Sequence, residues 1–276
     1  MNQPYNDLPI GVFDSGVGGL TVLKALRDEL PAEKFIYLGD TARLPYGTKS
    51  PETITRYALQ VAEKLIARHI KLLVIACNTV SSVALEVLRK TCAPLPVIGV
   101  VEPGAQAACL ASITGQIAVI GTESTIARGA YQQAIHAINP SACIIAKACS
   151  LFVSLAEEGW LEGDIVESIA SRYLKEMLAE HPGTSPDCLV LGCTHFPLLA
   201  PAIGHVAGPD VTLVDSAGTT ARAIRIILIK RNLTTRRSTS GQTHFLATDS
   251  ASRFARVGTI FLQKTIRPED VEIVDL

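Results

Sequence analysis

The 276-residue chain has almost no excess charge, since its 25 basic and 26 acidic side chains nearly cancel. A protein that binds nucleic acid through its phosphates carries a basic surface, so this balance argues against such a partner. The one basic cluster consists of Lys230, Arg231, Arg236 and Arg237. We interpret it as a solvated helix end followed by a polar loop.

Segments that direct a chain to a membrane are also missing. The first residues, MNQPYNDLPIGVFD, have neither the basic start nor the long apolar stretch of a secretory signal. No apolar run approaches the roughly 18 residues of a membrane span. We therefore expect a cytoplasmic protein with no membrane partner.

Closely paired cysteines are absent as well. The seven cysteines are an odd number, none forms a C-x-x-C pair, and several stand in apolar segments where a free thiol behaves as a small hydrophobic group. The spacing predicts a reduced protein without disulfides. It also lacks the close ligand pairs of structural zinc sites, so no metal is expected.

What the sequence does contain is a series of short apolar runs separated by segments with helical spacing. Continuous hydrophobicity fits strands covered on both faces, as in parallel sheets. Strands are expected at 10–14, 34–40, 71–77, 96–100, 116–122, 142–149, 188–193 and 211–216. Helices are expected between them, for example over 51–69 and 164–180. This alternation predicts an α/β fold of doubly wound parallel sheets.

A weak internal repeat divides the chain into two halves. IGVFDSGVGGLTVLKAL, from Ile10, has a counterpart in IAVIGTESTIARGAYQQAI, from Ile117, and LLVIACNTVSSVALEVL has one in CLVLGCTHFPLLAPAI. We expect two similar α/β domains that face each other across an active-site cleft, with a boundary in the proline- and glycine-rich stretch 93–104. After residue 210 the chain is expected to return to the first half.

Polar and reactive side chains gather where the predicted strands end. Functional groups of open parallel sheets collect at the carboxyl ends of strands. The residues expected at such ends are Asp14, Asp40, Cys77, Cys193 and Asp215. If the two halves face each other, Cys77 and Cys193 become opposed groups.

The stretch DSGVGGLT, residues 14–21, follows a predicted strand and precedes a predicted helix. Thr21 stands where the dinucleotide-binding fingerprint needs glycine or alanine, and the lysine of a P-loop is absent. A tight turn whose free backbone amides bind a carboxylate explains the glycines. Asp14 then serves either as a turn or cap residue or as a functional carboxylate.

Cys77 and Cys193 differ from the other cysteines because each stands where an apolar run gives way to polar residues. Three kinds of chemistry suit them: zinc binding together with His195, nucleophilic hydrolysis with His195 as base, and a two-base proton transfer. Hydrolysis leaves one cysteine unexplained. In the two-base reaction one thiolate removes a proton from a carbon and the opposed thiol protonates the other face. A non-catalytic protein that binds a small anion is a further alternative.

Five motifs in this order resemble the bacterial glutamate racemases, from about Ile10 to about Leu262: GVFDSGVGGL, YLGDTARLPYG, IACNTVSS, LVLGCTHFPLL and LVDSAGTTA. The cysteine motifs also occur in the wider aspartate/glutamate racemase superfamily, whereas DSGVGGL and DTARLPYG favour the glutamate branch. The resemblance implies a homodimer of two-domain chains. Residues 1–98 with 210–276 would form the first domain, and residues 99–209 the second.

The resemblance implies an enzyme that interconverts L- and D-glutamate without a cofactor and supplies D-glutamate for peptidoglycan. Cys77 and Cys193 would be the acid/base thiols, assisted by Asp14 and His195 respectively. An aspartate racemase, or another two-thiol racemase, would share both cysteine motifs and differ in its pocket. Control by a cell-wall precursor, which occurs within the family, is left open.

The substrate contacts implied by the resemblance come from four short stretches. They are Asp14 and Ser15, then Pro45, Tyr46 and Gly47, then Cys77, Asn78 and Thr79, and finally Cys193, Thr194 and His195. A further carboxylate is implied after a CPLFVPLVE-like segment, which here reads CSLFVSLAEEGW, with Ser150 and Ser154 in place of both prolines. We align Glu157 with that carboxylate, and its neighbour Glu158 is the alternative.

Overall fold

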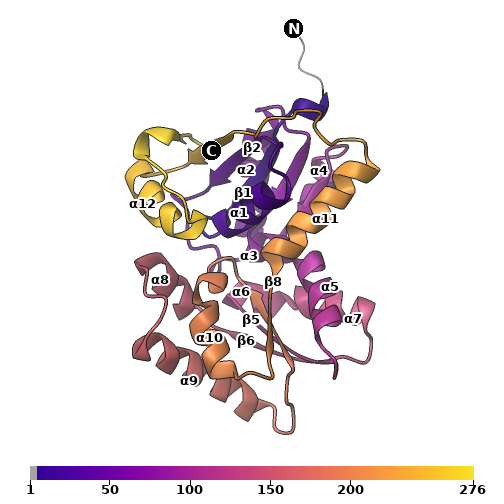
Figure 1. Cartoon of the computed structure of the whole chain (residues 1–276), viewed down its shortest axis with the longest axis vertical. Coiled ribbons are helices and arrows are strands. Elements are labelled where there is room, and N and C mark those ends of the chain that lie inside the picture. Colours follow the sequence, from indigo (N-terminus) through magenta and orange to yellow (C-terminus); the bar gives the residue numbers. More distant parts are fainter. Residues whose placement is uncertain (1–4) are drawn as a thin grey trace.

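The computed structural model describes residues 5–276 and contains two lobes, each built on a parallel sheet (Figure 1). The larger lobe has six strands in the order β10-β9-β2-β1-β3-β4, and all its neighbouring pairs are parallel. The strands are β1 (Ile10–Asp14), β2 (Phe35–Gly39), β3 (Leu72–Ile75), β4 (Val97–Gly99), β9 (Thr243–Ala247) and β10 (Val271–Ile273).

The smaller lobe has four parallel strands in the order β6-β5-β7-β8. They are β5 (Gln116–Gly121), β6 (Cys143–Ala148), β7 (Cys188–Gly192) and β8 (Thr212–Asp215). The predicted α/β class with two doubly wound parallel sheets is confirmed.

Helices cover both faces of each sheet, which is why the central strands β1, β2, β3, β5 and β7 are apolar along their length rather than alternating. One face of the larger sheet packs against α1 (Leu20–Glu29), α11 (Ser216–Lys230) and α12 (Ala251–Leu262), and the other against α2 (Pro51–Ile66), α3 (Asn78–Val83) and α4 (Leu85–Thr91). In the smaller lobe, α5 (Val101–Ala111) and α7 (Ala130–Ile138) cover one face, and α8 (Leu151–Glu158), α9 (Asp164–Glu180) and α10 (Ala200–Ala207) cover the other.

Shorter elements complete the fold. They are α6 (Glu123–Arg128) and the 3-10 helices η1 (Tyr5–Asp7), η2 (Phe196–Leu199) and η3 (Pro268–Asp270). Within residues 5–276 the structure has no helix whose length and apolar character would let it span a bilayer.

Local sequence explains where α2 begins and which side it buries. Ser50 caps the helix, because its hydroxyl accepts a hydrogen bond from the Thr53 amide at 3.3 Å, and Pro51 occupies the first helical position. The residues facing the sheet recur at helical spacing: Ile54, Ala58, Val61, Ala62 and Leu65.

The path of the chain between the lobes differs from the expectation in one respect. Residues after 210 were expected to rejoin the first half, yet β8 pairs with β7 in the smaller sheet, with Leu213 opposite Leu189. The chain returns to the larger lobe with α11, which packs against α1. The division into domains at 98/99 and 209/210 stays a prediction, with β8 lying beyond its second boundary but still in the smaller sheet.

A buried ion pair ties the amino-terminal side of the larger sheet together. Lys71 is fully buried, and its Nζ donates to Glu33 Oε2 at 2.5 Å and to the carbonyls of Asn6 and Leu233. The second oxygen of Glu33 accepts from the Thr235 amide at 2.9 Å. The loop after α11 is thereby held at the amino-terminal side of the sheet.

Glu33→Gln is expected to lower the free energy of unfolding by about 3 kcal/mol, because it leaves the Lys71 charge buried without its counter-ion. Urea denaturation at neutral pH measures the change. Glu86→Gln is the matched control, since Glu86 pairs with Arg89 while its own side chain is 73% exposed. Its removal is expected to cost under about 0.5 kcal/mol, and equal effects of the two variants would contradict the prediction.

Candidate active site

The carboxyl ends of both sheets meet at a cavity of about 160 Å³ between the lobes. This is smaller than the roughly 300–1,000 Å³ of pockets that hold drug-sized ligands, so it suits a molecule of amino-acid size. Most of the predicted contact residues line it, namely Ser15, Pro45, Tyr46, Gly47, Cys77, Asn78, Thr79, Cys193, Thr194 and His195. Glu157 lines it as well.

Asp14 is the one predicted contact residue that does not line the cavity. It ends β1, is 1% exposed, and accepts a hydrogen bond from the Gly16 amide through Oδ2 at 2.9 Å. Its other oxygen, Oδ1, has no hydrogen-bond partner among residues 5–276. Burial raises the pKa of this carboxyl. Asp14 thus stands behind the cavity wall rather than on it.

Cys77 lies between the end of β3 and the start of α3. Its sulfur is 3.3 Å from Ser15 Oγ. Burial, reinforced by the nearby charge of Asp14, raises the pKa of the Cys77 thiol to about 12. Cys77 therefore carries its proton at neutral pH.

Cys193 follows β7 and begins a chain of polar contacts. Its sulfur is 3.7 Å from His195 Nδ1, and His195 Nε2 is 3.2 Å from Glu157 Oε1. Burial alone would lower the pKa of His195, but Cys193 and Glu157 outweigh it and raise that pKa to about 10. The imidazole is then positively charged at neutral pH and lies next to the Cys193 sulfur.

Glu157 and its neighbour on α8 point in different directions. Glu157 faces the cavity and contacts His195, whereas Glu158 is exposed. Burial would raise the pKa of Glu157, but His195 and Arg253 together lower it. Arg253 Nη2 donates to Glu157 Oε2 at 2.8 Å. No sequence motif drew attention to Arg253.

The loop that carries Pro45, Tyr46 and Gly47 is anchored outside the cavity. The Tyr46 hydroxyl donates to the buried carboxylate of Asp40, which also accepts from Arg43 Nε at 2.6 Å. Asp40, expected at a strand end, therefore holds this loop in place rather than facing the cavity.

Asn78 lines the cavity and has an unpaired donor. Its Oδ1 accepts from the Tyr131 hydroxyl of the smaller lobe at 2.6 Å, which orients the amide. The other amide atom, Nδ2, is buried and has no partner within the described part of the chain. A buried unsatisfied donor is costly, so a bound carboxylate would relieve it.

Hydroxyl groups join the lobes beside Cys77. Thr79 Oγ1 is 2.9 Å from Thr122 Oγ1, which is 3.0 Å from Thr125 Oγ1. Thr122 also lines the cavity and was not predicted. The rule applied to the other strand ends would have found it, because Thr122 follows β5 directly.

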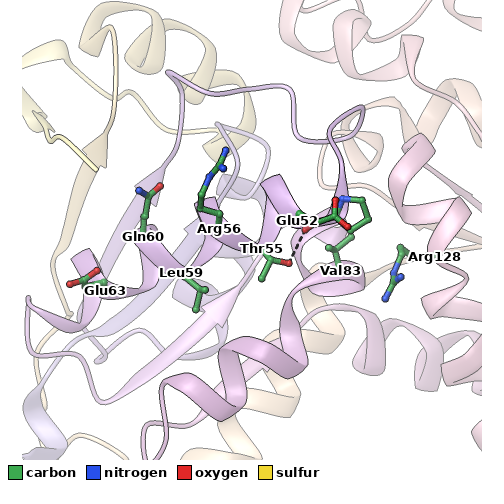
Figure 2. A pocket seen from close by; sticks show the side chains of 9 residues that line it. Glu52, Thr55, Arg56, Leu59, Gln60, Glu63, Val83 and Arg128 are labelled. Atoms are coloured by element: carbon green, nitrogen blue, oxygen red, sulfur yellow. Dashed lines mark hydrogen bonds between the residues drawn. The ribbon is translucent and has the colours of Figure 1, made fainter.

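A larger hollow of about 640 Å³ lies elsewhere, along the exposed side of α2 (Figure 2). Figure 2 shows Glu52, Arg56, Gln60 and Glu63 spaced along one helix, with Arg128 approaching from another element. Neither predicted cysteine lines it, and its polar groups are solvated side chains. The smaller cavity is therefore the candidate site, because it joins the two cysteine motifs.

All seven cysteine thiols are free. Among residues 5–276, no group of three or more His, Cys, Asp or Glu side chains is arranged to hold a metal ion.

Comparison with known proteins extends these observations. The profile of the Asp/Glu/Hydantoin racemase family matches residues 10–224. A glutamate racemase of Geobacter metallireducens is 51% identical over 253 residues, which cover 92% of this chain and 92% of that protein.

Solved structures show the same fold. The glutamate racemase of Francisella tularensis in complex with D-glutamate superposes with a TM-score of 0.88 at 38% identity and covers 98% of each chain. The Escherichia coli glutamate racemase, in complex with L-glutamate and the activator UDP-MurNAc-Ala, gives 0.73 at 29% identity, covering 93% of this chain and 94% of that one.

Proposed function

The chain belongs to the Asp/Glu/Hydantoin racemase family, and from this membership and its cavity we propose that it interconverts L- and D-glutamate without a cofactor. The observation that carries the proposal is that two thiols, one from each lobe, line a single cavity of amino-acid size. Racemisation needs a base and an acid on different faces of one carbon, and two such thiols supply both.

In one direction of the reaction, Cys193 acts as the thiolate base and Cys77 as the thiol acid. The thiolate takes the α-proton of one enantiomer, forming an S–H bond while the C–H electron pair stays on Cα. The Cys77 S–H bond then breaks, and its proton joins Cα from the other face. One turnover moves the thiolate charge from Cys193 to Cys77, and that enzyme form accepts the opposite enantiomer.

The α-proton of an amino acid is far less acidic than a thiol, so the site must stabilise the carbanion. The free Nδ2 donor of Asn78 and the backbone amides of the strand-end turns are suited to the substrate carboxylates. The cavity is lined largely by buried residues, so a bound substrate would be partly shielded from water with each sulfur near Cα. Asp14 influences the reaction through the effect of its charge on the Cys77 thiol. His195 influences it through its contact with the Cys193 sulfur.

Circular dichroism of the purified protein with L-glutamate and then D-glutamate, in D2O and without added cofactor, tests the proposal. We expect the optical signal of both enantiomers to decay to zero and the product to carry deuterium at Cα. An unchanged optical signal with glutamate, together with racemisation of aspartate, would assign the chain to another branch of its superfamily. Ligand binding without any exchange at Cα would favour the anion-binding alternative.

Further expectations from the resemblance stay predictions. They are the supply of D-glutamate for peptidoglycan, a cytoplasmic location and a homodimer. The activator in the Escherichia coli structure is a cell-wall precursor, so we propose that this chain be tested for activation by the same compound.

A further inference from the structure

One ion pair links the lobes beside the candidate site. Arg253 belongs to α12, which packs in the larger lobe, and Glu157 belongs to α8 of the smaller lobe. Their side chains meet at 2.8 Å, and Figure 1 shows α12 directly above α8 on the same side of the molecule. The side chain of Glu157 is 14% exposed and that of Arg253 is 54% exposed.

Neither charge stabilises its own helix. Glu157 lies in the last turn of α8, where the helix dipole disfavours a negative charge. Arg253 lies in the first turn of α12, next to the cap made by Ser250, where the dipole disfavours a positive charge. Since both placements break the local rule, the pair serves the contact between the lobes rather than either helix.

The backbone of α12 holds Arg253 firmly. Phe254, Val257 and Phe261 are buried in the core of the larger lobe. Phe261 also packs its ring edge-on to His195, with centroids 5.0 Å apart. Helix α12 therefore contacts both Glu157 and His195, the two residues whose polar contacts end at the Cys193 sulfur.

Arg253 does not line the cavity, so it has no direct contact with a substrate there. It fixes the carboxylate instead. Glu157 has two oxygens, and Arg253 holds Oε2 while Oε1 faces His195. Without the guanidinium, the carboxylate at the helix end is free to turn toward solvent, and His195 loses its partner.

On the basis of the two-thiol racemisation proposed above, we propose that Arg253 is a positioning residue for the Cys193 half of the reaction, that is, for the proton transfers between Cα and the Cys193 sulfur. It acts across the lobes through Glu157 and His195. The Cys77 half, on the other lobe, shares no hydrogen bond or ion pair with this chain of groups in the described residues. The two halves should therefore respond differently to its loss.

Arg253→Ala is expected to lower kcat roughly tenfold with KM changed less than about twofold, the size of one charge-assisted hydrogen bond. The thermal midpoint should stay within about 2 °C, because half-exposed ion pairs add little stability. Arg253→Lys should recover part of kcat, since lysine keeps the positive charge but lacks the planar guanidinium donors that arginine offers to a carboxylate. The control is Arg256→Ala, at an exposed position on α12 whose side chain has no ion pair within residues 5–276, and it should match the wild type.

A double-mutant cycle with Glu157→Gln tests whether Arg253 acts through Glu157. If Arg253 acts only through Glu157, the double variant is no slower than Glu157→Gln alone. Multiplied effects of the two single changes would overturn the proposal, as would equal losses in Arg253→Ala and Arg256→Ala.

Isotope effects separate the two halves of the reaction. Because the enantiomers are equally stable, kcat/KM stays equal in both directions in every variant, which is an internal check. In Arg253→Ala, the α-deuterium effect on kcat/KM should rise for the enantiomer deprotonated by Cys193 and fall for the other. An equal change for both enantiomers would overturn the proposal. Absence of racemisation in the wild type would instead refute the proposed function.

Discussion

Cys77→Ser and Cys193→Ser are each expected to lower kcat for racemisation on the order of 10²–10⁴-fold, with KM within about threefold of the wild type. A serine hydroxyl is far less acidic than a thiol, so it neither forms the resting base nor donates its proton as readily. The cavity shape changes little, because the substitution replaces one small side chain by another. Circular dichroism of both glutamate enantiomers measures kcat and KM.

Cys143→Ser is the matched control for these two variants, because Cys143 is exposed and lies away from the cavity. It should keep wild-type kcat. Each active-site variant also retains one thiol, which can still exchange the α-proton of the enantiomer it faces. We expect proton NMR in D2O to show exchange without inversion, for one enantiomer in Cys77→Ser and for the opposite one in Cys193→Ser. Near-wild-type racemisation in either variant would refute the two-thiol reaction.

Gly18→Ala is expected to lower kcat about 100-fold although the side chain added is a single methyl group. A β-carbon at this position would lie 2.5 Å from His195 Nδ1 and would also press on Thr194 Oγ1. His195 has little room to retreat, since Phe261 packs against its ring and Glu157 holds its other nitrogen. The displaced imidazole then loses its alignment with Cys193.

The control for this variant is Gly218→Ala. A β-carbon at Gly218, in α11, would have its nearest contact at 3.6 Å, to the end of the flexible Arg222 side chain. This variant should keep full activity and gain slightly in stability, because alanine is the better helix former. Steady-state kinetics and thermal unfolding of both variants provide the comparison. An unchanged kcat in Gly18→Ala would show that His195 can move without loss.

The central strands of both lobes were predictable from the sequence, because they are continuously apolar. The strand 10–14 and the helix 164–180 have the bounds that the pattern predicted. The strands β9 and β10 were missed. β9 begins with the polar residues Thr243 and His244, and β10 has three residues, so their pairing with β2 and with each other, rather than any apolar pattern, makes them strands.

The α/β class and the position of both thiols at strand ends can be predicted from sequence, because apolar continuity and the residue that follows a strand are local features. Three other features come from the packing of distant segments: β8 joins the smaller sheet, Glu157 rather than Glu158 faces His195, and Arg253 completes the chain of contacts. Glu157 and Arg253 are separated by 96 positions and belong to different lobes. Their contact depends on how α12 packs against the larger sheet, and no local pattern encodes that packing.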